Sequence, residues 1–141
     1  MADVRELYDQ DFNVWAQETA AALRAGRWAA VDVEHVAEEI EDMAKRNKRE
    51  LESRLTQILE HLLKLRLAKG LILDYNRGGW EASILRQRGE IKSLLSESPS
   101  LGRLIDQQLI DACYRRAAAS VAAEYGVEPP SQCPFHREDL L

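Results

Sequence analysis

A run of 38 residues without glycine or proline dominates this chain: residues 32–69 read DVEHVAEEIEDMAKRNKRELESRLTQILEHLLKLRLAK, and Gly70 follows. Apolar side chains recur along the run at spacings of three and four, which is the period of one helical face. Asp32 is a favourable N-cap residue, and Gly70 is typical of a helix end. The run therefore predicts one helix of about 57 Å, which is long for a domain of this size.

The same spacing predicts which side chains of this helix face inward. They are Val33, Val36, Ala37, Ile40, Met43, Ala44, Leu51, Leu55, Ile58, Leu59, Leu62 and Leu65. The charged residues 45–49 interrupt this apolar series, and Asn47 falls on its line. Polar residues at such positions can set the register between helices. We expect the helix either to kink there or to present part of its length to a partner.

Residues 7–26 form a second segment with helical spacing, which ends at Gly26. Its face carries Tyr8, Phe12, Trp15, Thr19, Ala22 and Leu23. Because aromatic side chains carry the largest apolar area, we expect Phe12 and Trp15 to enter the core together.

The second half of the chain contains clear boundary signals. Residues 70–79 are rich in glycine and include Asn76, so they predict a loop, followed by a helix over residues 80–96. Ser98 is expected to cap a helix over residues 99–125 that has Pro99 at its first position. Three prolines in residues 127–141 predict an extended tail with at most one helical turn.

These segments predict an all-α protein. The expected architecture is a single domain over residues 1–141, a helical bundle of four main helices with one unusually long central helix and an extended C-terminal tail. No segment shows the two-residue alternation of a half-buried strand.

Composition narrows the function classes. Hydrophobic residues make up 45% and charged residues 30% of the chain, which excludes a disordered protein. The net charge of −5 gives no global positive field for nonspecific nucleic-acid binding. No apolar stretch reaches the length of a membrane span, the N-terminus lacks a signal-peptide pattern, and two cysteines form no disulfide framework. We expect a cytoplasmic protein with free thiols and no membrane contact.

Acidic residues and two histidines on the long helix form the first candidate site. Carboxylates four residues apart beside His35 are similar to one strip of a helical metal site, but the Glu-x-x-His pattern of such sites is missing. We therefore predict no metal and no cofactor, and interpret the acidic strip first as a solvated face. A weaker hypothesis is an enzyme pocket in which a general base would need a partner group. Its polar lining would be Glu38, Glu41, Arg54 and His61.

Basic residues around an aromatic ring form the second candidate site. Cations near a helix C-terminus interact favourably with the helix dipole, so most of the basic residues here need no ligand. An aromatic ring between arginines can nevertheless hold a phosphate or a nucleic-acid strand. The candidate anion-binding residues are Arg77, Trp80, Arg86, Arg88 and Lys92.

Several short sequence motifs are distributed over nearly the whole chain. They are Leu7–Phe12 with Trp15, Leu23–Arg27, Glu38–Glu41, Glu50–Leu51 with Ser53–Leu55, His61–Lys64, Trp80, Ser98–Leu101 and Cys133–Phe135. In this order they resemble the bacterial family catalogued as domain of unknown function 29. The resemblance implies an all-helical bacterial protein and supplies no activity. Residues 71–73 are more apolar than is usual in this family.

The long amphipathic helix and the lack of a complete catalytic site favour a noncatalytic protein-interaction or regulatory module. Its expected partner is a protein, and one option is a second copy of the chain in a homo-oligomer. The alternative hypothesis is binding of nucleic acid or another polyanion near Trp80, and the third is the polar enzyme pocket. No residue is assigned a catalytic role.

Overall fold

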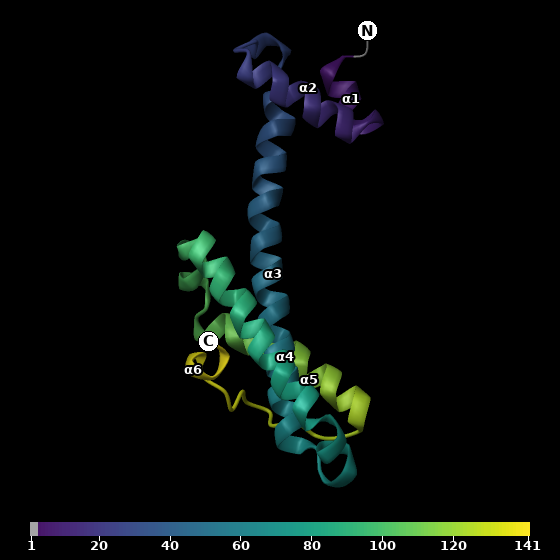
Figure 1. Cartoon of the computed structure of the whole chain (residues 1–141), viewed down its shortest axis with the longest axis vertical. Helices are drawn as coiled ribbons and strands as arrows, with labels where there is room; N and C mark the ends of the chain where they lie inside the picture. Colours follow the sequence, from purple (N-terminus) through teal and green to yellow (C-terminus); the bar gives the residue numbers. More distant parts are fainter. Residues whose placement is uncertain (1–2) are drawn as a thin grey trace. The chain divides into compact units, whose positions relative to one another are not determined.

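The computed structural model describes residues 3–141 and contains helices and no strand within them (Figure 1). This confirms the predicted all-α fold. Within the described residues, the helices longer than ten residues are α2 (Phe12–Arg24), α3 (Val33–Leu67), α4 (Gly70–Glu97) and α5 (Gln107–Tyr125). The predicted long helix is α3, and its 35 residues agree closely with the expected boundaries.

The chain divides into two compact units, residues 1–46 and residues 47–141. The second unit contains the main hydrophobic core, because α4 and α5 lie along the second part of α3 (Figure 1). From α3 this core takes Leu51, Leu55, Ile58, Leu59 and Leu63, from α4 Ile84 and Ile91, and from α5 Ile110, Cys113, Tyr114, Ala117 and Val121.

The inward positions predicted for the second part of α3 are largely confirmed. Leu51, Leu55, Ile58 and Leu59 are fully buried. Leu62 and Leu65 are only partly buried, and Leu63 is buried in their place. Leu63 is buried because α4 and α5 cover the helix from two directions, so the buried face is wider than one stripe.

The first unit contains α1 (Val4–Gln10), α2, the 3-10 helix η1 (Trp28–Ala30) and the first part of α3. The prediction of one helix over residues 7–26 is wrong, because Asp11 takes an extended conformation and its carboxylate accepts a hydrogen bond from the backbone N–H of Val14 at 3.1 Å. Asp11 thus caps a new helix. Trp15 is buried as predicted, whereas Phe12 remains 50% exposed.

The predicted loop over residues 70–79 is also wrong, since α4 begins at Gly70 and continues through it. Within residues 70–79 only Gly70 has a positive φ, of 62°, and it lies at the tight turn after α3. Gly78 and Gly79 adopt no left-handed conformation, and the Asn76 amide donates to the Ile72 carbonyl one turn earlier. The side chain that suggested a turn therefore bonds within the helix.

The segment after α4 differs from the predicted single helix. Residues 99–104 form the 3-10 helix η2 (Pro99–Leu104), and α5 starts anew after Asp106, which accepts a hydrogen bond from the Leu109 N–H at 2.9 Å. Pro99 occupies the helix start as predicted, but the Ser98 side chain makes no cap. The tail is extended apart from the single turn α6 (Arg137–Leu140), whose Leu140 is fully buried.

The inward positions predicted for the first part of α3 are mostly wrong. Within the first unit, α1 and α2 lie against a different side of this helix, through its residues 35 and 39. The apolar side chains that the spacing predicted to face inward are therefore exposed. They are Val33, Ala37, Ile40, Met43 and Ala44.

Candidate functional site

An aromatic cluster fixes α1 and α2 to the start of α3. The Tyr8 ring stacks on the His35 ring with centroids 3.8 Å apart, and the Trp15 ring meets Tyr8 edge-on at 4.9 Å. The Tyr8 hydroxyl donates to a Glu39 carboxylate oxygen at 2.6 Å. This hydrogen bond, followed by burial, raises the pKa of Tyr8 to about 12. The cluster covers one side of α3 and keeps it in place.

Asp32 joins this cluster at the helix start. Its carboxylate is buried, pairs with the His35 ring and accepts a hydrogen bond from the His35 backbone N–H. Burial alone would raise the pKa of Asp32, but the hydrogen bonds from His35 outweigh it and the pKa is lowered. Among the described residues, no serine, threonine or cysteine hydroxyl or thiol bonds to the His35 ring. The pair therefore serves to cap and anchor α3.

The side of α3 away from this cluster carries an apolar face that is exposed to solvent. Val33, Ile40 and Met43 are 66%, 63% and 57% exposed. Ala37 and Ala44 are exposed as well, and with Val33 and Ile40 they follow the helical spacing of four, three and four. Met43 lies at the flank of this row, on the side nearer to Asp32 and Glu39. We call these five residues the α3 stripe.

The first unit buries little apolar surface of its own. Its buried side chains within residues 3–46 are Trp15, Thr19, Ala22 and Asp32. Units this small rarely supply enough core to be stable without an additional partner, metal or cross-link. The α3 stripe is thus a large apolar surface on a unit that has a small core.

Charged residues line one edge of the α3 stripe. Glu34, Glu41 and Lys45 are all exposed along the first part of α3. Glu34 and Lys45 are eleven residues apart, close to three helical turns, so they lie on the same edge at opposite ends. An apolar stripe with a charged border is the pattern of a helix that pairs with another helix.

The predicted polar pocket is divided between the two units. Glu38 and Glu41 belong to residues 1–46 and are exposed, whereas Arg54 and His61 belong to residues 47–141. Arg54 donates to Glu50 at 2.8 Å and to the Gln87 side chain at 2.9 Å. The Gln87 amide in turn donates to Gln57. This network links α3 to α4 and was not predicted, although the Glu50–Arg54 spacing of four signals its first half.

His61 is partly buried, as its position in the helical period suggested. Burial lowers the pKa of His61, and the nearby cations Lys64 and Arg86 lower it further. Its Nδ1 atom is buried and has no hydrogen-bond partner among the described residues. Lys64 itself pairs with Glu124 at 3.0 Å. The imidazole is therefore neutral near pH 7 and lacks the partner that a general base requires.

The predicted anion-binding residues are placed in different surroundings. Arg77, Arg86 and Lys92 are exposed on α4. Arg88 donates to the backbone carbonyl of Asp139 in the tail. Trp80 is 93% buried, since its ring meets Tyr125 edge-on and Lys64 lies 6.0 Å above it. The ring thus fills the core of the second unit and offers little face for stacking.

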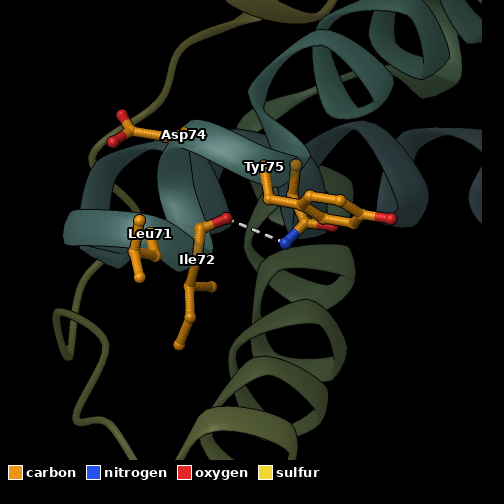
Figure 2. A pocket seen from close by; sticks show the side chains of 5 residues that line it. Leu71, Ile72, Asp74 and Tyr75 are labelled. Atoms are coloured by element: carbon orange, nitrogen blue, oxygen red, sulfur yellow. Dashed lines mark hydrogen bonds between the residues drawn. The ribbon is translucent and has the colours of Figure 1, made fainter.

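The start of α4 carries a smaller apolar patch. Leu71 and Tyr75 are 85% and 89% exposed, and they border a shallow hollow with Ile72, Asp74 and Asn76. Figure 2 shows the side chains of Leu71, Ile72 and Asp74 extending away from the ribbon, and the hydrogen bond from Asn76 to the Ile72 carbonyl. Polar atoms that converge on a ligand are few here, so the patch is no defined small-molecule site.

Residues 3–141 contain neither a metal-binding cluster nor a membrane-spanning helix. No three histidine, cysteine, aspartate or glutamate side chains gather there in a way that could hold a metal ion. None of the helices in this part of the chain has the length and apolar character needed to cross a membrane. Cys113 and Cys133 are both free.

Comparison with known proteins gives one match. No curated protein and no solved structure matches the chain. The sequence profile described as "Domain of unknown function DUF29" matches residues 7–141, which is nearly the whole chain. The chain therefore belongs to the DUF29 family.

Proposed function

We propose that the protein is a noncatalytic helical interaction module that binds a helix of a partner protein through the α3 stripe. The observation that carries this proposal is the exposure of Val33 and Ile40 on a helix whose other side is held by the Tyr8–His35 cluster. A surface that is apolar, continuous along a helix and already formed in the single chain is suited to binding without rearrangement.

The chemistry of the α3 stripe favours a helical partner. Its apolar residues follow the helical period over residues 33–44, about three turns. Ala37 and Ala44 alternate with the larger Val33 and Ile40, so a second helix can approach closely and insert its side chains between them. A small molecule would instead need a concave pocket with convergent polar groups.

The free thiols of Cys113 and Cys133 support a reducing compartment such as the cytoplasm. Burial raises the pKa of both thiols, so neither is activated as a nucleophile. These properties support a binding role over cysteine chemistry.

The proposal is tested by affinity capture with the tagged full chain from cells that produce the protein naturally. Wild-type protein should recover a protein partner that resists nuclease, and Ile40→Asp should lose it, because the charge enters the centre of the stripe. Leu71→Asp is the matched control, since Leu71 is equally apolar and more exposed but lies on α4. The proposal fails if Ile40→Asp retains everything that wild type captures.

The same experiment addresses the polyanion alternative. If nuclease removes every specific partner of the wild-type protein, the exposed cations of α4 become the binding surface instead. Arg77→Glu and Arg86→Glu would then weaken the capture, and binding would fall steeply with salt because phosphate contacts release counterions.

A further inference from the structure

We infer that the helix that covers the α3 stripe is the α3 stripe of a second copy of this chain, paired antiparallel about a two-fold axis. This inference rests on the proposed function and names the partner of the same surface. Three features of the first unit support it: the sizes of the stripe residues, the charges at its edge, and the small core beneath it.

The stripe residues alternate in size in a self-complementary order. Along α3 they run Val33, Ala37, Ile40 and Ala44, that is large, small, large, small. With the two-fold axis between residues 37 and 40, Val33 of each copy lies against Ala44 of the other, and Ala37 lies against Ile40. A large side chain meets a small one at every layer, which permits close packing. A parallel pair would instead set Ile40 against Ile40 and Ala37 against Ala37.

The charges at the stripe edge are self-complementary in the same orientation. Glu34 lies near one end of the stripe and Lys45 near the other. The antiparallel pair brings Glu34 of each copy beside Lys45 of the other, which makes two equivalent ion pairs. In a parallel pair these residues would lie eleven residues apart, about 16 Å along the helices, and would not meet. Edge charges of this kind set helix orientation and partner choice.

Pairing would also enlarge the small apolar core of the first unit. Its side chains that are buried within residues 3–46 include one large apolar residue, Trp15. Pairing would cover Val33 and Ile40 on both copies and so extend the apolar core across the two-fold axis. The cluster of Tyr8, Trp15 and His35 lies on another side of α3 and leaves this face free.

The test is size-exclusion chromatography with light scattering on the full chain over a range of micromolar concentrations. Wild-type protein should give a mass of about 32 kDa, twice the 16.0 kDa of one chain. Ile40→Asp should give the single-chain mass with an unchanged circular dichroism spectrum, because Ile40 is exposed in the single chain. Leu71→Asp should remain a dimer.

The orientation is tested by exchanging the edge charges. Glu34→Lys alone and Lys45→Glu alone should each weaken the dimer, raising its Kd by roughly threefold to tenfold for two equivalent exposed pairs. The double variant should return the Kd close to that of wild type, because each lysine then meets a glutamate of the other copy. A double variant that is as weak as the singles would overturn the antiparallel arrangement.

Other outcomes separate this inference from the proposed function. A mass of one chain at every concentration overturns the self-pairing, and so does a dimer whose Kd is unchanged by Ile40→Asp. If the monomeric protein still captures a different protein that Ile40→Asp loses, the proposed function stands and the second copy is the wrong partner. If Ile40→Asp changes neither mass nor capture, both are wrong.

Discussion

The buried and the exposed parts of α3 are best compared by making the same substitution in each. Ile58 is fully buried in the second unit, and Ile40 is 63% exposed in the first. Both are isoleucines in the same helix, so Ile58→Ala and Ile40→Ala remove the same three carbon atoms and introduce the same helix former. The difference in their cost therefore reports what covers each side chain.

The magnitudes follow from burial. At about 0.8 kcal/mol per buried carbon, Ile58→Ala loses roughly 2.4 kcal/mol, and the residual cavity adds about 1 kcal/mol. The higher helix propensity of alanine offsets about 0.4 kcal/mol, so the net cost is about 3 kcal/mol. For Ile40→Ala only the buried part of the side chain, about a third, contributes to the lost transfer free energy, which is about 0.9 kcal/mol. The higher helix propensity of alanine offsets about 0.4 kcal/mol of this, so the net cost is about 0.5 kcal/mol.

The assay is urea unfolding followed by circular dichroism, at submicromolar protein so that any dimer is dissociated. With a slope of about 2 kcal/mol per molar urea, Ile58→Ala should lower the midpoint by about 1.5 M and Ile40→Ala by about 0.3 M. Equal shifts at this concentration would refute the exposure of the stripe in the single chain. A cost of Ile40→Ala that grows with protein concentration would support pairing of the stripe.

Three further predictions concern single contacts. The Tyr8–Glu39 hydrogen bond holds the folded pKa of Tyr8 at about 12, above the ordinary 10.0, so its stabilisation is present below pH 10 and lost as the pH rises through 12. In a tyrosinate absorbance titration corrected with Tyr8→Phe, Glu39→Gln should lower this pKa toward 10. Glu41→Gln should leave the pKa of Tyr8 unchanged. Burial lowers the folded pKa of His61 below 6.5, so the unfolded chain binds the extra proton and stability is lost as the pH falls below about 6.5. In His61→Gln the urea midpoint should therefore differ less between neutral and mildly acidic pH than it does in the wild-type protein. An identical pH dependence in both proteins would contradict a lowered pKa of His61. Gln87→Ala removes the partner of Arg54 and Gln57 and should cost about 1–3 kcal/mol in urea unfolding, whereas Lys92→Ala, exposed on the same helix, should cost less than about 0.5 kcal/mol.

Much of the helical framework was predictable because its signals are local. The start of α3 follows from Asp32, and its length follows from a run without glycine or proline. The breaks at Asp11 and Asp106 were missed although both are aspartates that cap the helix after them. Helical periodicity continues across such a break, so the period alone hides it. The available signal was the residue type, since aspartate is strongly preferred at the N-cap of a helix.

The start of α4 shows where propensity misleads. Glycines at positions 70, 78 and 79 with Asn76 indicate a loop by composition, yet the structure uses only Gly70 for a left-handed turn. Helix interiors tolerate glycine at about 1 kcal/mol each when tertiary contacts repay it. Here Trp80, Ile84 and Ile91 bury the later turns of the same helix in the core. Such long-range packing cannot be read from a local window.

The candidate site was predictable in its residues and not in its surroundings. Val33, Ile40 and Met43 were placed on one apolar face by spacing alone, and the face exists. Whether a face is covered depends on the direction from which other helices approach, and α1 and α2 reach α3 through His35 and Glu39 instead. Likewise, Trp80 was recognised as an important ring, but only the fold shows that Tyr125 and Lys64 cover it.

The two parts of α3 also differ in the kind of apolar residue they carry, and this difference supports an interface over a core. Residues 51–65 present mostly leucines, which fill the interior between α4 and α5. The α3 stripe instead mixes alanines with Val33, Ile40 and Met43 and is bordered by exposed carboxylates and Lys45. Such a border keeps a free single chain soluble, while small residues let a second helix approach closely. A surface that has to exist both exposed and covered requires both properties, and a permanently buried core requires neither.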